Sequence, residues 1–419
     1  MRNIKEKRPN GLIVLSLFDG MSCGRMALEN ANIKIEKYMA SEIKPFAIEH
    51  TLKHYPSTLQ LGDVTRIHYK DGVLYYDCQR KLIDSLANHP KKTKWSKKEL
   101  DYFKTHNLEV CDNGEVYKWC CKKASIAHIG KIDLLIGGSP CKQFSSAFYF
   151  CKKVEEQGLK GKDSSLFYEY LRLLKEIEPT FFFLENVKMK KESEDTLTSY
   201  LNVKPLAINS NLLTYQNRAR VYWTNIEGIS IPKDANVNFQ DYLIRTLPRV
   251  EHILRYNKFH EAKLPLALSN DEVDAIIASN RWVYDELISE DATLTKEEVV
   301  NIIHEQLVET IAKNAPFRDK ILYGDKDGKY KNKNLSLPTS TKIGALTRRQ
   351  DRNPCSGVIL FDDFYRYLNT FEQARAQDVP LSYVRDLRWK DASDILGDGW
   401  TISVVAHCFT YLNDKYDFE

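Results

Sequence analysis

Residues 12–24 read LIVLSLFDGMSCG, and this stretch decides the fold. The apolar run Ile13–Phe18 is typical of a strand that is buried on both faces. A glycine-containing turn follows it and leads into an apolar-periodic run with Met26 and Leu28, which predicts a helix. Glycines in such a turn let the backbone approach a ligand at the helix N-terminus. The turn lacks the G-x-G-x-x-G spacing, which argues against a dinucleotide pyrophosphate as that ligand.

The same alternation of strand and helix continues through the first two-thirds of the chain. Further strands are expected at residues 37–40, 133–136, 180–184, 206–208 and 221–226. This order predicts an α/β protein with a doubly wound, mostly parallel sheet that is covered by helices on both faces. Ligands of such sheets bind at the carboxyl ends of the strands.

Composition narrows the class of protein further. The 419 residues suggest two or three domains, and the 43% hydrophobic content excludes wholesale disorder. No apolar run approaches the ~18–20 residues of a membrane span, and the polar N-terminal stretch does not resemble a signal peptide. The nine scattered cysteines are typical of free thiols in a reducing compartment. We therefore expect a cytoplasmic protein without a membrane partner.

Two stretches interrupt the alternation. An insertion at about residues 66–131 has a Lys-rich middle, for which a solvated surface helix and a nucleic-acid contact both remain open. Its cysteines lack a C-x-x-C pair, so no metal is expected. The second stretch, residues 227–365, begins acidic, and the pattern Thr295…Glu298 there predicts a capped helix. Residues 318–352 are basic and rich in hydroxyl groups, which suits phosphate contacts, although a flexible solvated loop would look the same.

Three acidic residues mark one side of a cleft at the carboxyl edge of the sheet. Asp19 follows the first strand, and Glu42 lies 23 residues later, near the spacing at which an acid meets ribose hydroxyls. Asp63 ends another short apolar stretch and could accept a hydrogen bond from an adenine amine. Together these residues describe an adenosyl ligand without a phosphate bridge.

The other side of the cleft carries reactive groups. Cys141 ends the stiff loop Gly137-Gly138-Ser139-Pro140-Cys141, although a buried, inert thiol is the commoner fate of a cysteine. Glu185 follows an apolar strand, and the start of the next strand brings Arg218 and Arg220 to one face. A thiol, a carboxyl group and two guanidinium groups suit attack on an electron-poor heteroaromatic ring.

These motifs resemble those of the cytosine-5 DNA methyltransferase family. The resemblance covers about residues 12–226 and 366–411. It is carried by LSLFDGMSCG (15–24), GGSPC (137–141), FLENV (183–187), QNRAR (216–220), the segment 368–380 and GDGWT (397–401). The motifs LFDG and G-x-x-W resemble the animal de novo branch and its bacterial and phage relatives, and a bacterial or phage enzyme is expected.

The resemblance implies a class I, Rossmann-like methyltransferase fold and S-adenosylmethionine as methyl donor, with S-adenosylhomocysteine as product. It divides the chain into a catalytic domain (1–226), a smaller target recognition region (227–365) and a C-terminal segment (366–419) that returns to the catalytic domain. Double-stranded DNA is the implied partner, and a monomer is assumed. Residues 143–165 would form a mobile loop that closes over a flipped-out base.

The resemblance also assigns roles to single residues. Catalysis is expected of Cys141, which would add to C6 of the cytosine, and of Glu185, Arg218 and Arg220. Donor contacts are expected from Phe18, Asp19, Gly20, Met21, Cys23, Gly24, Glu42, Ile43, Asp63, Val64 and Trp400. Contacts to the nucleic acid are expected from Ser139, Pro140, Ser145 and Asn186. Many bacterial members carry Gly-Asn where this chain has Gly397-Asp398, so Trp400 is a better donor contact than Asp398.

Two other functions remain open on sequence alone. One branch of the family methylates tRNA and carries Cys-Phe-Thr inside its recognition region. That tripeptide occurs here at residues 408–410, in the C-terminal segment instead. A catalytically silent DNA-binding regulator would be free to lose Cys141 or Glu185, and this chain keeps both.

Overall fold

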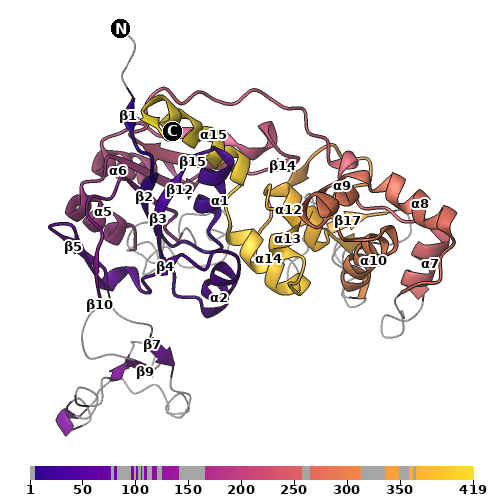
Figure 1. Cartoon of the computed structure of the whole chain (residues 1–419), viewed down its shortest axis with the longest axis horizontal. Coiled ribbons are helices and arrows are strands. Elements are labelled where there is room, and N and C mark those ends of the chain that lie inside the picture. Colours follow the sequence, from indigo (N-terminus) through magenta and orange to yellow (C-terminus); the bar gives the residue numbers. More distant parts are fainter. Residues whose placement is uncertain are drawn as a thin grey trace, which may run out of the picture.

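The computed structural model is shown in Figure 1. It describes residues 5–76, 80–82, 96–98, 101, 105, 108–110, 116–119, 125–140, 166–256, 265–312, 336–348, 358–361 and 365–419. Cys141, Ser145, the loop 143–165 and most of the basic stretch 318–352 lie outside these residues.

A seven-stranded sheet forms the centre of the first lobe, with strand order β13-β15-β12-β11-β2-β3-β4. Only β15 runs antiparallel to its neighbours, so the expected mostly parallel sheet is confirmed. The strands are β2 (Leu12–Leu17), β3 (Ile35–Ser41), β4 (Leu59–Gln60), β11 (Leu134–Gly137), β12 (Phe181–Val187), β13 (Leu206–Asn209) and β15 (Ala219–Thr224).

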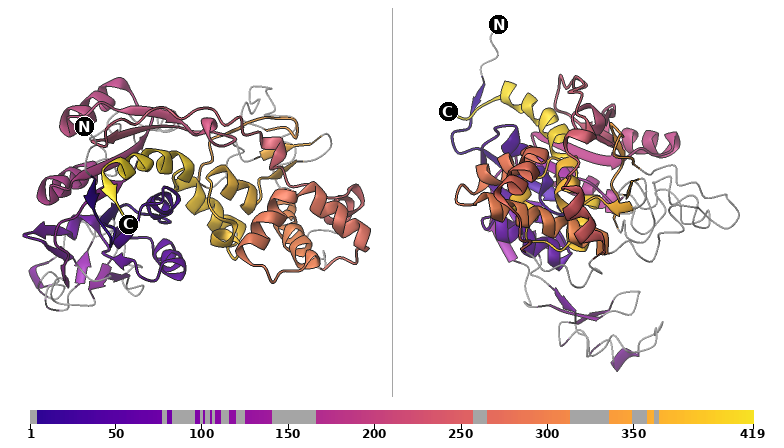
Figure 2. Two further views of the ribbon diagram at one scale, coloured as in Figure 1. Left: turned by 45° about the horizontal axis from the view of Figure 1, so that its top comes forward. Right: turned by 90° about the vertical axis from the view of Figure 1, so that its right-hand side faces the viewer.

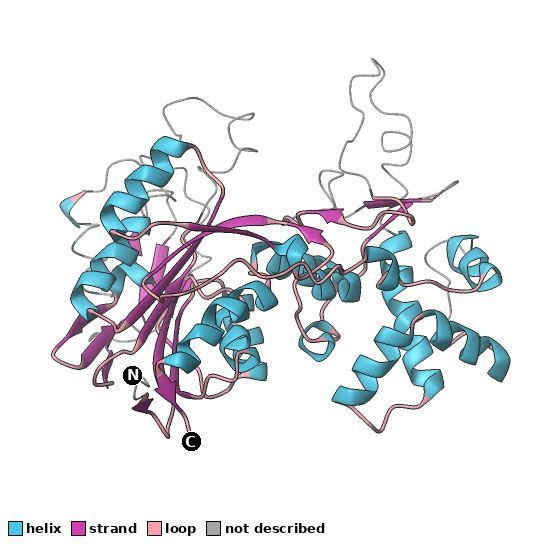
Figure 3. Cartoon of the chain, turned by 90° about the horizontal axis from the view of Figure 1, so that it is seen from above, coloured by secondary structure: helices cyan, strands magenta, loops and turns pink. Residues whose placement is uncertain are grey.

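Alternation along β2 divides the apolar side chains between two cores. Leu12 and Val14 join the core beneath α1 and α15, whereas Ile13, Leu15 and Leu17 join the core beneath α5 and α6. Helices therefore cover both faces of the sheet, as Figure 3 shows. The helices are α1 (Cys23–Asn30), α2 (Pro45–His54), α5 (Leu166–Ile177), α6 (Lys191–Leu201) and α15 (Ile402–Phe409).

The first and last parts of the insertion form a small antiparallel sheet that packs on the core beneath α5 and α6. Its strands are β5 (His68–Lys70), β6 (Val73–Tyr76) and β10 (Ser125–His128), in the order β10-β6-β5. The Tyr69 N–H donates to the Glu176 carboxylate of α5 at 3.0 Å, which connects this sheet to the first lobe. A second three-stranded sheet of β7 (Arg80–Leu82), β8 (Leu108–Val110) and β9 (Val116–Trp119) projects away from the body in Figure 1.

The second lobe is mainly helical (Figure 2). It contains α7 (Pro248–Tyr256), α8 (Asn270–Ser279), α9 (Arg281–Glu290) and α10 (Lys296–Ala312). The expected capping box is present, because the Glu298 N–H donates to the Thr295 hydroxyl and Glu298 accepts from the Thr295 N–H. Val299, Ile303 and Leu307 of α10 are buried, as their spacing predicts.

The C-terminal segment connects the two lobes. Helices α12 (Thr370–Ala376), α13 (Leu381–Val384) and α14 (Trp389–Asp398) lie beside the helices of the second lobe, and α15 then packs on α1. Short pairings complete the fold: β1 (Glu6–Lys7) with β19 (Tyr416–Asp417), β14 (Gln216–Asn217) with β16 (Ile343–Gly344), and β17 (Val358–Leu360) with β18 (Tyr365–Tyr367). Single 3-10 turns lie at Val64–Arg66, Ser210–Leu212, Phe239–Asp241 and Thr410–Asp414.

A buried ion pair fixes the start of α12. The Arg366 guanidinium donates to both carboxylate oxygens of Glu372 at 2.7 Å, and both side chains are almost fully buried. Glu372 also accepts from the N–H groups of Ile244 and Asn369. The carboxylate thus connects the second lobe to the C-terminal segment, with each of its oxygens hydrogen-bonded twice.

We expect Glu372→Gln to lower the free energy of unfolding by about 3–5 kcal/mol, because it leaves the Arg366 charge buried without a counter-charge. Urea unfolding followed by circular dichroism measures this change. Asp285→Asn, which removes the exposed Arg281–Asp285 pair, is the control and should cost less than about 1 kcal/mol. Equal unfolding midpoints for the two variants would contradict the expectation.

Candidate active site

The turn after β2 is held in an unusual backbone conformation. Phe18, Gly20 and Ser22 have φ angles of 59°, 59° and 58°, in the left-handed region that costs most residues other than glycine about 1–3 kcal/mol. The buried Asp19 carboxylate stabilises the turn by accepting from the hydroxyls of Tyr38, at 2.7 Å, and Ser22, at 2.5 Å. Burial raises the pKa of Asp19 above its usual range. Asp19 is therefore a buried hydrogen-bond acceptor that holds the turn in this conformation.

Glu42 joins the carboxyl ends of β2 and β3. Its carboxylate accepts from the N–H groups of Gly20, Ile43 and Lys44 at 2.9, 2.8 and 2.9 Å. A Cβ added at Gly20 would meet no atom within 4 Å, so the turn faces open space there. The Ile43 side chain, 62% exposed, lies at the rim of the same edge.

Asp63 lies at the next strand end. The Ser41 hydroxyl donates to the carbonyl of Gly62 at 2.8 Å, which brings this end beside β3. Asp63 accepts from the Thr65 N–H at 3.0 Å and so begins the 3-10 turn that contains the buried Val64. The structure thus places Asp19, Glu42 and Asp63 at the ends of three neighbouring strands.

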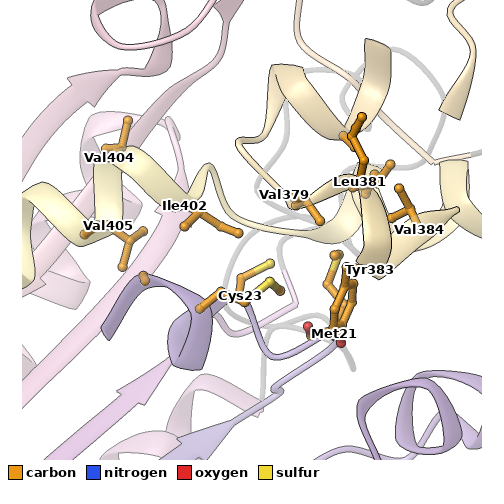
Figure 4. Packing of buried hydrophobic residues seen from close by; sticks show 14 of the residues in the cluster. Met21, Cys23, Val379, Leu381, Tyr383, Val384, Ile402, Val404 and Val405 are labelled. Carbon is orange, nitrogen blue, oxygen red and sulfur yellow. Dashed lines mark hydrogen bonds between the residues drawn. The ribbon is translucent and has the colours of Figure 1, made fainter. Parts of the chain in front are cut away.

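The C-terminal segment covers the turn after β2. The Tyr383 hydroxyl donates to the Met21 carbonyl at 2.9 Å, and the Trp400 N–H lies 3.3 Å from the Cys23 sulfur. Figure 4 shows Met21 and Cys23 among apolar side chains of this segment, such as Val379 and Ile402. Burial raises the pKa of the Cys23 thiol to about 12, so this sulfur stays protonated and unreactive at neutral pH.

Trp400 lies close both to the helix that follows the turn after β2 and to the loop after β11. A Cβ at Gly24 would lie 3.5 Å from the Trp400 ring, and a Cβ at Gly138 would lie 2.9 Å from the indole nitrogen and 3.1 Å from the Glu185 carboxylate. Glycine at position 138 therefore lets the loop after β11 pass between the indole and the carboxylate.

Glu185 is held by a cation from the adjacent strand. Its carboxylate pairs with the Arg220 guanidinium at 2.8 Å, and both side chains are more than four-fifths buried. Glu185 lies within β12, opposite Tyr222 of β15, whereas the sequence suggested a position just after the strand. The strand extends further because β15 continues to pair with it as far as Val187.

The neighbouring residues hold the loop after β11. The Asn186 side chain donates to the Ser139 hydroxyl at 3.1 Å, and Ser139 is buried while Pro140 is partly exposed. Asn186 and Ser139 thus bind each other, and this contact fixes the last described residues before Cys141.

Arg218 and Arg220 have separate partners. The buried Arg218 guanidinium donates to the carbonyls of Leu346, at 2.7 Å, and Gly399, at 2.8 Å, and makes a longer bond to Gly397. The sequence placed the two arginines on one face of the strand, with Arg220 at the base and Arg218 assisting structurally or at phosphate. The structure instead directs Arg218 to the C-terminal segment and Arg220 to Glu185.

Sequence reasoning missed one group of charges at this site. Asp398 pairs with Lys44 at 2.6 Å and with Arg348 at 3.3 Å. The departure from Gly-Asn at positions 397–398 drew attention to Asp398 but gave no hint of its partners, because they lie 354 and 50 residues away.

Within the part of the chain that the structure describes, no group of His, Cys, Asp and Glu side chains is arranged to hold a metal ion. None of the described helices combines the length and apolar character needed to cross a membrane.

Comparison with known proteins identifies the family. The family model for C-5 cytosine-specific DNA methylase matches residues 87–412. Orphan methyltransferase M.SPBetaI of Bacillus phage SPbeta is 25% identical over 357 residues, covering 80% of this chain and 72% of the relative. Orphan methyltransferase M.Rho11sI of Bacillus phage rho11s is 27% identical over 179 residues, which cover 42% of this chain. The chain spans only about a quarter of the length of the first curated relatives it matches.

A solved structure shares the fold. Methyltransferase EhMeth of Entamoeba histolytica superposes with a TM-score of 0.53 at 11% identity, covering 96% of this chain and 98% of that one. The fold is that of class I S-adenosylmethionine-dependent methyltransferases. Because the family model matches most of its length, the chain belongs to the C-5 cytosine-specific DNA methylase family.

Proposed function

We propose that this protein is a DNA cytosine-5 methyltransferase that acts through a covalent bond between Cys141 and C6 of a flipped-out cytosine. The observation that carries the proposal is the position of Gly138 between the Trp400 indole and the Glu185 carboxylate. The loop that leads to Cys141 thereby passes from the wall of the donor pocket to the group that would bind the base.

The residues at the first three strand ends fit S-adenosylmethionine. The open space above Gly20 leaves room for a ligand beside the turn, and Glu42 and Asp63 supply carboxylates for ribose hydroxyls and an adenine amine. Phe18, Ile43, Val64 and Trp400 would supply the apolar walls. When bound, the donor supplies an electrophilic methyl group on a sulfonium. The absence of a phosphate-binding G-x-G-x-x-G turn agrees with this ligand.

Each reactive group of the chain has its own role in the proposed reaction. The Cys141 thiolate forms a bond to C6, which leaves C5 electron-rich, and C5 then accepts the methyl group. Glu185 acts as an acid that gives a proton to N3 as the thiolate adds, accepts a hydrogen bond from the exocyclic amine, and takes the proton back when the thiolate is eliminated. Loss of the C5 proton to a base and elimination of the Cys141 thiolate restore the aromatic ring and release 5-methylcytosine. A stacked base is inaccessible to this attack, so the cytosine must be flipped out of the duplex.

Arg220 supports this chemistry by orienting Glu185. Its guanidinium holds one carboxylate oxygen, which leaves the other oxygen facing the loop at Gly138. The same guanidinium would also bind the O2 edge of the base. Arg218 would act at a distance, by fixing the turn that carries Trp400.

We expect Cys141→Ser to abolish methyl transfer while donor binding measured by calorimetry persists, because serine is a far weaker nucleophile. Methyl incorporation into mixed-sequence duplex DNA measures the loss. Duplex DNA containing 5-fluorocytosine should trap the native enzyme as a species stable on a denaturing gel, because fluorine cannot leave C5 as a proton does. The serine variant should form no such species, and retained turnover in it would end the assignment.

We expect Glu185→Gln to lower kcat by about 10²–10³-fold, because the amide removes one preorganised electrostatic contact to the ring. The control is Glu194→Gln on α6, which loses only an exposed pair with Lys191 and should retain the native rate. Comparable rates for the two variants would remove Glu185 from the mechanism.

The choice of nucleic acid is tested by comparing methyl incorporation into duplex DNA and into tRNA. We expect duplex DNA to be the substrate, because the family model and the phage relatives carry DNA methylase or methyltransferase names and the Cys-Phe-Thr tripeptide lies in α15 and the turn after it, at positions 408–410. Incorporation into tRNA alone would favour the RNA enzyme, and incorporation into neither would favour a silent regulator.

A further inference from the structure

The turn Gly397-Asp398-Gly399 lies in close contact with both lobes. A Cβ at Gly397 would lie 2.5 Å from the backbone nitrogen of Arg348, in the second lobe. A Cβ at Gly399 would lie 3.1 Å from the sulfur of Cys23, in the turn after β2. The contact at Gly397 is closer than a side chain allows and the contact at Gly399 is tighter than most Cβ contacts, so the turn forms a thin layer between the donor pocket and the recognition region.

Asp398 carries the charge at the centre of this layer. Its carboxylate pairs with Lys44 at 2.6 Å and with Arg348 at 3.3 Å, and the three side chains are 36%, 48% and 32% exposed, respectively. One carboxylate therefore holds a cation from each lobe. We call these three residues the Asp398 bridge.

Lys44 connects the bridge directly to the donor pocket. Its backbone N–H donates to the Glu42 carboxylate at 2.9 Å, and Lys44 is also the N-cap residue that directly precedes α2. The backbone that carries Lys44 therefore also holds the Glu42 carboxylate.

The position of Asp398 argues against a purely structural role in its own helix. Asp398 is the last residue of α14, where the helix dipole disfavours a negative charge. Neutralising this side chain should not weaken the helix, so the two cations account for the acid at this position.

We propose that Asp398 is a positioning residue that, through Lys44 and Arg348, holds the Glu42 turn against the recognition region and so raises the affinity for the methyl donor. This inference rests on the proposed function, because it requires the pocket to bind S-adenosylmethionine. The bridge is partly exposed, so salt should weaken it.

The test is calorimetric titration of the full-length protein with S-adenosylmethionine at about 50 and about 500 mM salt, where the screening length falls severalfold. We expect Asp398→Asn to raise the Kd by about two- to five-fold at low salt, the range typical of exposed ion pairs. The native Kd should approach that of the variant at high salt. Lys44→Met should act in the same direction, and the double variant should be no weaker than Asp398→Asn alone, because the Lys44 pair is one of the two interactions that Asp398→Asn already removes.

The matched control is Asp386→Asn, which breaks the exposed Lys53–Asp386 pair of 2.7 Å outside this layer. It should leave the Kd unchanged. In steady-state assays, Asp398→Asn should raise the KM for the donor while kcat and the thermal unfolding midpoint stay native, which separates positioning from loss of fold.

The inference fails if the native protein binds the donor and Asp398→Asn binds it equally well at low salt. It also fails if Asp386→Asn weakens binding as much, or if the Lys44 and Asp398 effects add. Failure of the native protein to bind the donor at all would overturn the proposed function and this inference together.

Discussion

The Arg218 guanidinium connects the central sheet, the second lobe and the C-terminal segment. It is almost fully buried, and it binds the carbonyls of Leu346 and Gly399 from the end of the central sheet. A buried guanidinium is costly unless its donors are hydrogen-bonded, so the second lobe and the C-terminal turn must both be in place around it. The positions of Trp400 and Asp398 follow, since both belong to the turn that Arg218 holds.

The site uses backbone and side-chain contacts to fix each carboxylate before any ligand arrives. Three N–H groups hold Glu42, two hydroxyls hold Asp19, and one guanidinium holds Glu185. Groups held in this way need little reorganisation when charge develops on a substrate, which is the principal source of electrostatic catalysis. The strained turn from Phe18 to Ser22 agrees with this design, because strained backbone persists where the surrounding structure over-determines it.

The local elements could be predicted from sequence because their signals are local. The apolar runs at β2, β3, β11 and β12 and the capping box of α10 each depend on residues within one element. The order of the motifs likewise pointed to the methylase family. Other features depend on distant residues: the extension of Glu185 into the strand requires pairing with β15, and the separate partners of Arg218 and Arg220 require the C-terminal turn.

The sequence by itself determined the family to which this chain belongs and the class of its fold, because residue types and the order of strands and turns are written along the chain. Only the tertiary structure decided which charges meet. Lys44, Arg348 and Asp398 are far apart in sequence, and ion pairing between exposed side chains leaves no periodic pattern by which sequence could reveal it. Their meeting depends on how two lobes close around one glycine-flanked turn, which is a property of the packed molecule.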